Sequence, residues 1–329
     1  MQYVDHGAGG GPEVLHLATT TRPTPGPDEV LIQVAYAGIN RPDCGQRLGR
    51  YPPPPEASPI LGLEVAGTVV AVGANVTTWR SGDTVCALTP GGGYAQYCVA
   101  PAAHCLPVPR GWSLQQAAAL PEALFTVWDN LMERARLRPG ETLLVHGASG
   151  GVGSLAVQLA SQRGVRVFAM AGSAAKAARC LAWGAEAAIE HRTEDFVARC
   201  HELTQGRGVD VILDMLGGPV LDQNLSALAM DGRIALIAFM AGAEATINVV
   251  PILRKRATLT GSTLRPCSHD HKARLAAALS AEVWPLLDAG HCQPHIDRIF
   301  ALADAAAAHA YFESGQHLGK VLLNCQSPT

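Results

Sequence analysis

The chain has 329 residues, of which 48% are hydrophobic and 16% are charged, and its formal net charge at pH 7 is -3. This composition supports a large buried core and excludes an intrinsically disordered chain. The slight negative charge and the lack of any basic run argue against nucleic acid as a partner.

The chain shows no targeting or membrane signal. The first residues, 1–11, lack the cationic start and apolar run of a secretory signal, and the longest apolar region, 225–243, is broken by Asp231, Gly232 and Arg233. Nine cysteines occur without any C-x-x-C spacing, which indicates scattered reduced thiols. We therefore expect a globular cytoplasmic protein that does not enter a membrane.

The first third of the sequence is typical of a β-rich domain. Proline and glycine divide it repeatedly, and apolar runs between them predict short strands at 30–37, 63–72, 84–88 and 96–99. Short strands separated by many turns indicate a small barrel-like or sandwich domain.

From about Ser113 the pattern changes to alternating strands and helices. Strands are predicted at 142–146, 165–170, 187–190, 209–215, 233–239 and 258–264, with helices at 151–163, 174–183, 195–203 and 219–229. Such alternation predicts a parallel sheet covered by helices on both faces. The tail, 269–329, is predicted to hold two helices and two short strands, the last at 321–324.

A glycine-rich turn joins the first of these strands to the first of these helices. Small residues let the backbone approach a pyrophosphate, and the free N–H groups of the helix start point at it. The residues expected to hold the phosphates are Ser149, Gly150, Gly151, Val152 and Gly153. The strand–turn–helix context makes this motif stronger than a glycine pattern alone, although a tight turn without a ligand is the alternative.

The next strand ends at Gly172 and Ser173, where a site for NADH usually has an acidic residue that binds the ribose 2′-hydroxyl. This sequence has no acid there, and Lys176 and Arg192 follow it. Their charges favour a 2′-phosphate, so the sequence predicts NADPH. The alternative is that Lys176 is an ordinary solvated helix lysine.

With these residues in hand, the chain resembles the zinc-independent quinone oxidoreductases of the medium-chain dehydrogenase/reductase superfamily over nearly its whole length. The resemblance is carried, in family order, by the blocks 11–15, 38–43, 61–67, 117–121, the glycine turn and 318–321. The branch that contains the tumour-suppressor-inducible quinone oxidoreductase shares the further blocks 51–54, 90–93 and 121–123.

The resemblance implies a GroES-like catalytic domain over residues 1–122 and 266–329, with a Rossmann NADPH-binding domain inserted at 123–265. It also implies a cofactor cleft between the two domains and a homodimer. Zinc members have Cys where this chain has Asn40 and His where it has Leu63; leucine cannot bind zinc, and the asparagine amide is a poor ligand. We therefore expect no metal.

By match to family positions, Asn40 and Tyr51 are the candidate catalytic residues, with Tyr51 as a hydroxyl donor to the substrate oxygen. The same match places a further set near the nicotinamide: Thr126, Phe239, Met240, Ser262 and Leu264. His191 stands where the family commonly has a tyrosine beside the adenosine phosphate, and it is expected either to contact the cofactor or to be a surface residue.

Without a Lewis acid, the chemistry suits an acceptor that is already electron-poor, because a quinone becomes aromatic when it is reduced. The leading interpretation is an NADPH-dependent quinone reductase. Reduction of the C=C bond of an enone is the alternative, and a non-enzymatic role, crystallin-like or RNA-binding, is the third reading.

Overall fold

The computed structural model describes residues 1–326, which form two compact units. Unit 1 combines both ends of the chain: Met1–Phe125, Arg265–Gly290 and Pro294–Thr329, whose last three residues, also the end of the predicted segment 266–329, lie outside the described part. Unit 2 comprises Thr126–Leu264 and His291–Gln293. Each unit has its own sheet and its own apolar core.

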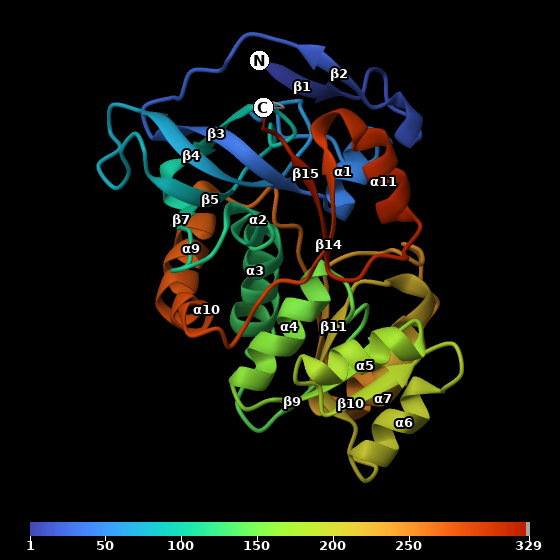
Figure 1. The fold of residues 1–329 in the computed structure, drawn as a ribbon. Helices are drawn as coiled ribbons and strands as arrows, with labels where there is room; N and C mark the ends of the chain where they lie inside the picture. Colours follow the sequence, from blue (N-terminus) through green and yellow to red (C-terminus); the bar gives the residue numbers. More distant parts are fainter. Residues whose placement is uncertain (327–329) are drawn as a thin grey trace. The chain divides into compact units, whose positions relative to one another are not determined.

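Unit 1 is built on a seven-stranded sheet in the order β14-β15-β3-β4-β5-β7, with β6 paired to β3. Its strands are β3 (Glu29–Gly38), β4 (Glu64–Val72), β5 (Thr84–Leu88), β6 (Tyr97–Pro101), β7 (Cys105–Pro107), β14 (Ile296–Ala301) and β15 (Lys320–Asn324). Figure 1 shows β15, near the C-terminal end of the colour scale, beside β3 near the N-terminal end. This pairing places Lys320 of the tail against the first third of the chain.

A separate antiparallel pair, β1 (Gln2–Asp5) and β2 (His16–Thr19), completes the strands of unit 1. Its helices are α1 (Arg41–Arg47), α2 (Leu114–Ala117), α9 (His269–Glu282), α10 (Trp284–Asp288) and α11 (Ala305–Glu313), and α3 (Pro121–Val127) runs across the boundary with unit 2. Short 3-10 turns occupy Pro12–Val14, Ala102–His104 and Leu302–Asp304.

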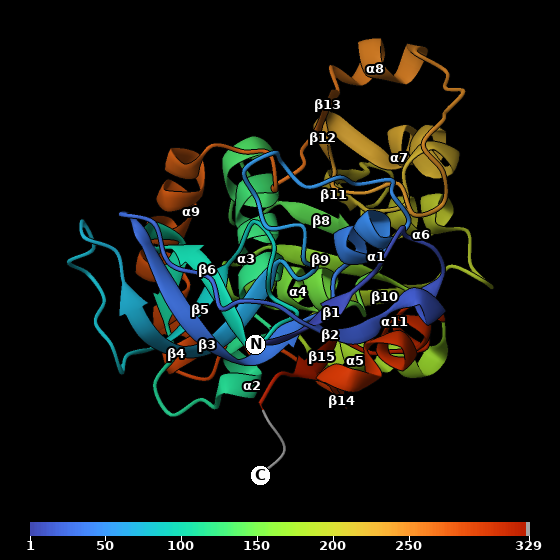
Figure 2. The same cartoon turned by 90° about the horizontal axis from the view of Figure 1, so that it is seen from above.

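Unit 2 contains a six-stranded parallel sheet in the order β10-β9-β8-β11-β12-β13, which can be followed in Figure 2. The strands are β8 (Thr142–Val145), β9 (Arg166–Ala171), β10 (Ala187–Glu190), β11 (Val209–Asp214), β12 (Leu228–Leu236) and β13 (Thr258–Gly261). The order reverses between β8 and β11, and open parallel sheets bind dinucleotides at such a switch point, beyond the carboxyl ends of the strands.

The helices of unit 2 are α4 (Gly151–Gln162), α5 (Ala174–Ala182), α6 (Phe196–Leu203), α7 (Leu221–Ala227) and α8 (Val250–Lys255), with a π-helical segment at Trp128–Arg134 and a 3-10 turn at Gly218–Val220. Every residue of β8 and β11 is buried, so both faces of the sheet are covered. Phe196 of α6 and Leu221 of α7 pack with Leu144 of β8 in one core. Because strand side chains alternate, His146 projects from the same face as Leu144.

These two sheets confirm the predicted architecture, a parallel sheet covered by helices and a separate β-rich domain built from both ends of the chain. Two local predictions were wrong, and one helix was missed. The described tail holds three α-helices rather than two, and α1 was not foreseen because Gly45 and Pro42 weaken its helical pattern. The strand predicted at 233–239 already starts at Leu228, since Asp231 and Gly232 form a bulge within β12 rather than a turn before it.

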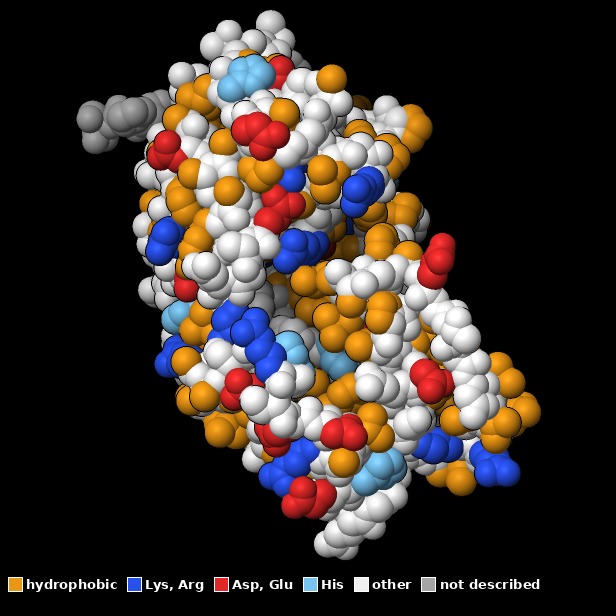
Figure 3. Space-filling model, turned by 90° about the vertical axis from the view of Figure 1, so that its right-hand side faces the viewer, with side chains coloured by type: hydrophobic (Ala, Val, Ile, Leu, Met, Phe, Trp, Pro, Cys, Tyr) orange, Lys and Arg blue, Asp and Glu red, His pale blue; other side chains and the backbone are white. Residues whose placement is uncertain are grey.

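One face of the molecule shows no bias towards one charge. On the face drawn in Figure 3, acidic and basic side chains are interspersed, without a broad area of either sign. Among the described residues, no helix is long and apolar enough to cross a membrane. All nine cysteines lie in the described part of the chain, and no disulfide joins any two of them.

Candidate functional site

The glycine turn of unit 2 leaves no room for a side chain at two of its positions, Gly147 and Gly153. Gly147 has φ +57°, in the left-handed region, and a Cβ on Gly153 would lie 2.3 Å from the Gly147 carbonyl oxygen. Because the obstructing atom is backbone, it cannot move aside as a side chain would. Helix α4 starts at Gly151, and the first N–H groups of a helix have no partner within it. The turn and helix start thus fit the phosphates of a dinucleotide.

The loop after β9 carries polar and basic groups. Ser173 caps α5, with its Oγ accepting a hydrogen bond from the Lys176 backbone N–H at 3.3 Å. The Lys176 side chain is half-buried, and Arg192 beyond β10 is exposed. No acidic residue occurs between Ala171 and Glu186, so the charge that this loop presents is basic.

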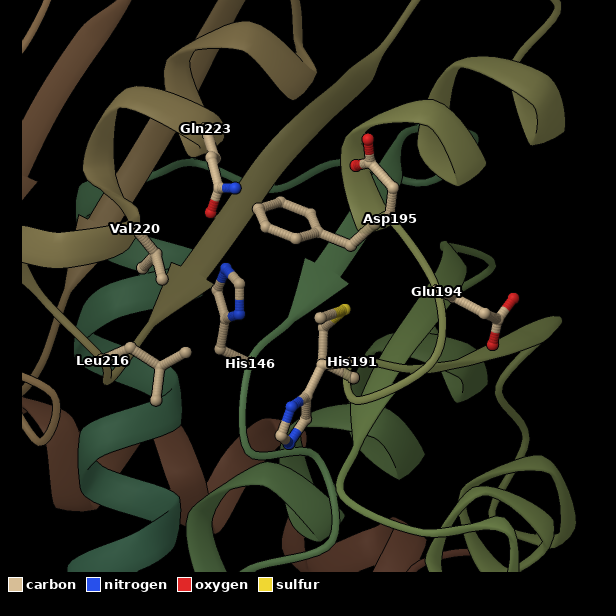
Figure 4. A pocket seen from close by; sticks show the side chains of 9 residues that line it. His146, His191, Glu194, Asp195, Leu216, Val220 and Gln223 are labelled. Carbon is tan, nitrogen blue, oxygen red and sulfur yellow. The ribbon is translucent and has the colours of Figure 1, made fainter.

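A cavity of about 300 Å³ opens beside this loop, within unit 2. It is lined by His146, Met170, His191, Glu194, Asp195, Phe196, Leu216, Val220 and Gln223. Figure 4 shows the His146 ring standing among these side chains, with Leu216 and Val220 on one side, while the Glu194 carboxylate points away from it. His191, exposed and on the cavity wall, has its Nε2 only 3.3 Å from where a Cβ on Gly172 would lie.

His146 is fully buried at the cavity and belongs to a three-residue network. Its Nε2 lies 2.7 Å from the Asn224 side-chain oxygen, and the Asn224 Nδ2 donates to Asp214 Oδ2 at 2.9 Å. The other Asp214 oxygen accepts from the backbone N–H groups of Leu216 and Gly217. Burial is the main influence on the His146 pKa and lowers it, so the ring is neutral.

The residues that the family resemblance places near the nicotinamide differ in their burial and hydrogen bonding. Asn130, which is buried, accepts a hydrogen bond from Ser262 Oγ at 2.9 Å and donates to the Thr126 carbonyl oxygen at 2.9 Å. Phe239 and Met240 lie beyond β12 with 66% and 50% of their surface exposed, so they are not part of the core. Leu264, the last residue of the main segment of unit 2, is buried.

Asn40 lies in a buried network of unit 1. Its Nδ2 donates to Glu64 Oε1 at 2.9 Å, while its Oδ1 accepts from Lys320 Nζ at 2.8 Å. Lys320 also pairs directly with Glu64 Oε1, and both side chains are at most 4% exposed. The Lys320 ammonium thus lies between Asn40 and Glu64, whose oxygen atoms a metal ion at this position would need as ligands. The neighbouring Leu63 offers no ligand atom.

Glu122 lies next to Glu64, and its protonation depends first on burial and then on the Glu64 charge. The Glu64 Oε2 accepts a hydrogen bond from the Glu122 backbone N–H at 2.9 Å. Burial, and then the nearby Glu64 charge, raise the pKa of Glu122 to about 8. The Glu122 side chain is therefore mostly neutral at pH 7, so the network carries fewer negative charges than the sequence suggests.

Tyr51 is half-buried beside Arg265, whose guanidinium carbon lies 5.8 Å from the centre of the Tyr51 ring. Arg265 is 6% exposed; its Nε donates to the Pro90 carbonyl and one terminal nitrogen donates to Gln46 Oε1. The other terminal nitrogen is buried without a hydrogen-bond partner. Burial, more than the Glu122 charge, raises the pKa of Tyr51 to about 12, so its hydroxyl stays protonated at neutral pH.

Each unit therefore contains some of the site residues that were predicted from the sequence. In unit 2, the glycine turn, the start of α5 with Lys176, and the loops that carry Gly172, Ser173, His191 and Arg192 all lie at the carboxyl edge of the sheet, where parallel strands end together. The sequence reading missed His146, Asn130, Glu64 and Lys320 as site residues. Glu64 and Lys320 were visible as charges inside apolar blocks, whereas nothing in the sequence links His146 to Asn224.

Comparisons with known proteins give a consistent picture. Residues 26–110 match the model of the alcohol dehydrogenase GroES-like domain, and residues 151–282 match that of zinc-binding dehydrogenases. A quinone oxidoreductase of Rattus norvegicus is 32% identical over 317 residues, covering 95% of this chain and 94% of the relative.

Two solved structures are similarly close. The Escherichia coli quinone oxidoreductase complexed with NADPH has a TM-score of 0.88 and 30% identity, covering 98% of this chain and all of that one. An NAD-dependent alcohol dehydrogenase also has a TM-score of 0.88 and 30% identity, covering 98% of this chain and 99% of that one. Backbone similarity alone thus does not distinguish between the two cofactors or the two substrate classes.

Proposed function

The chain belongs to the medium-chain dehydrogenase/reductase superfamily and is an oxidoreductase, and on that premise we propose that it is an NADPH-dependent quinone reductase that works without a metal. The proposal rests on the Lys320 ammonium, which lies between Asn40 and Glu64. Zinc-dependent members of the superfamily need metal ligands at this position. A reduction without a Lewis acid favours an acceptor that is already electron-poor.

The choice of NADPH is supported by the loop after β9. A 2′-phosphate adds negative charge, which an acid at Gly172 or Ser173 would repel and which Lys176 and Arg192 would attract. His191, on the wall of the adjacent cavity, is a further candidate contact. The glycine turn and the start of α4 would hold the pyrophosphate.

Tyr51 and Arg265 are the donors that we assign to the substrate. With its pKa near 12, the Tyr51 hydroxyl is a hydrogen-bond donor but a weak acid, so it orients a carbonyl oxygen rather than protonating it early. The free terminal nitrogen of Arg265 lies in the same part of unit 1 and would stabilise negative charge on that oxygen. Asn40, whose amide is already engaged by Glu64 and Lys320, is assigned a positioning role.

When bound, the nicotinamide supplies the hydride. The protein's own contribution is to hold the acceptor and to stabilise the oxygen charge that develops, which a quinone spreads over an aromatic ring as it is reduced. An enone carbonyl would use the same two donors, so C=C reduction is the competing outcome. The small net charge of -3 and the mixed surface of Figure 3 favour a small molecule over nucleic acid as the partner.

The test is kcat/KM for an ortho-quinone, a para-quinone and a simple enone, each with NADPH and with NADH. The proposal expects a quinone to be the best substrate and NADPH to be preferred; a higher value for the enone, or a clear preference for NADH, would contradict it. Tyr51→Phe is expected to lower kcat/KM about tenfold, because it removes one hydrogen bond to developing charge. Tyr36→Phe, which removes a hydroxyl bonded to Gln115 instead, is the matched control and should retain activity.

A further inference from the structure

A row of buried polar side chains in unit 1 has no role in the reduction proposed for this chain. At its centre lies His309 of α11, which is fully buried. The His309 Nδ1 lies 2.9 Å from one terminal nitrogen of Arg47 in the neighbouring α1 (Figure 1), and its Nε2 lies 3.1 Å from the Tyr94 hydroxyl oxygen. The other terminal nitrogen of Arg47 donates to both carboxylate oxygens of Glu313, at 3.0 and 2.9 Å.

Arg47 fixes the tautomer of His309. A guanidinium can only donate hydrogen bonds, so the His309 Nδ1 that faces it must be an acceptor. Burial, and then the Arg47 charge, lower the pKa of His309 to about 3, so the ring is neutral at pH 7 and its one proton sits on Nε2. That proton is donated to the Tyr94 oxygen, which leaves the hydroxyl hydrogen of Tyr94 for a second acceptor.

The second acceptor is the Asp43 carboxylate, with which the Tyr94 side chain forms a hydrogen bond. Asp43 is buried, and its two oxygens also accept the backbone N–H groups of Asn40 at 2.8 Å and of Gly62 at 3.0 Å. Because Asn40 caps the start of α1, the carboxylate links the first turn of this helix to the backbone at Gly62. Each donor offsets part of the cost of burying the carboxylate charge, so the loss of one donor weakens its hold on both backbone segments.

Every hydrogen bond of the row runs in one direction. Arg47 donates to His309, His309 donates to Tyr94, and Tyr94 donates to Asp43. A guanidinium does not give up its proton in a protein, so a row that ends on Arg47 cannot carry protons between the surface and Asp43. The row is therefore suited to holding a fixed geometry rather than to proton transfer.

We propose that His309 is a remote positioning residue for the reduction: through Tyr94 and Asp43 it holds the backbone of Asn40 in the arrangement that the acceptor requires. The Asn40 side chain is held separately by Glu64 and Lys320, so two networks fix the same residue, one at its backbone and one at its amide. This inference rests on the proposed function, because it assumes that Asn40 lies beside the reacting groups.

Two substitutions of His309 separate its hydrogen bonds from its packing. His309→Leu removes both hydrogen bonds, whereas His309→Gln retains an oxygen that can face Arg47 and an NH₂ group that can face Tyr94. We expect His309→Leu to lower kcat for a quinone about tenfold, the value of roughly one hydrogen bond, and His309→Gln to recover most of it. The Kd for NADPH should stay unchanged in both, because the glycine turn that binds the phosphates belongs to unit 2.

The control for stability is Phe312→Ala, which removes a buried apolar side chain from the same helix. It should lower Tm through the loss of apolar packing, yet kcat measured well below Tm should remain that of the unaltered protein.

Hydrogen exchange gives a second measurement that does not depend on a substrate. The Asn40 amide, which donates to Asp43, should exchange about tenfold faster in His309→Leu and near its original rate in His309→Gln. The amide of Val69, which donates to the Asp83 carbonyl elsewhere in unit 1, should exchange at the same rate in all variants.

The outcomes separate this inference from the proposed function. An unaltered protein that reduces neither a quinone nor an enone would contradict the proposed function, while faster exchange at Asn40 in His309→Leu would still support the coupling of His309 to Asn40. A folded His309→Leu protein with unchanged kcat would overturn the positioning role. So would a His309→Gln or Phe312→Ala protein that loses as much kcat as His309→Leu.

Discussion

Removal of the buried ammonium of unit 1, by Lys320→Met, should destabilise the protein severely. The change leaves the Glu64 carboxylate with only the Asn40 amide and the Glu122 backbone N–H as donors, in a site where Glu64 has no exposed surface. Breaking a buried ion pair by removing one partner costs about 3–5 kcal/mol. A similar cost is expected for Glu64→Gln, which leaves Lys320 buried without its counter-charge.

The diagnostic is a double-mutant cycle measured by urea unfolding with two spectroscopic probes. Because each single change leaves one unpaired charge and the double variant leaves none, the double variant should cost less than the sum of the singles by about 2–3 kcal/mol. Arg256→Ala, which breaks the exposed pair with Asp231, is the control and should leave the unfolding free energy unchanged. Additive single effects, or a Lys320→Met cost near that of the control, would refute this account of the network.

Other predictions concern the turn and the buried ionisable groups. Gly153→Ala should lower both Tm and NADPH affinity, because its Cβ would meet backbone at 2.3 Å, whereas Gly150→Ala, with its nearest atom at 3.4 Å, should leave Tm unchanged. Glu122 should make stability fall as pH rises from about 4.5 to about 8, since its pKa is raised in the folded state, and Glu122→Gln should flatten that slope in urea unfolding. Burial lowers the pKa of His104 from 6.5 to about 4, so stability should be lost as pH falls through that range, and His104→Gln should reduce this loss.

The sequence predicted the parallel sheet of unit 2 well because its strands are short apolar runs flanked by glycine. The strand at 187–190 and the helix at 174–183 agree with β10 and α5 to within one residue. The errors fall where local and tertiary signals conflict. Asp231 and Gly232 look like a turn, yet pairing with β11 and β13 keeps the chain extended on both sides of them.

Site prediction from sequence depends on whether the chemistry is encoded locally or arises from long-range contacts. The glycine turn is a contiguous motif, so its position follows from sequence. The partners of Asn40 are 24 and 280 residues away, and Asn224 is 78 residues from His146, so neither network has a local signature. The unpartnered nitrogen of Arg265 likewise depends on Pro90 and Gln46, which only the folded chain brings to it.

The two buried networks use the same components and differ in whether they are complete. In each, a carboxylate, of Glu64 or of Asp214, holds an asparagine amide in one orientation. In unit 1 the Asn40 amide oxygen also accepts a hydrogen bond from the Lys320 ammonium. The network is therefore closed, and it stabilises the backbone around Asn40. In unit 2 the Asn224 amide orients His146, whose second ring nitrogen is buried without a hydrogen-bond partner. A substitution in the closed network of unit 1 should therefore change mainly stability.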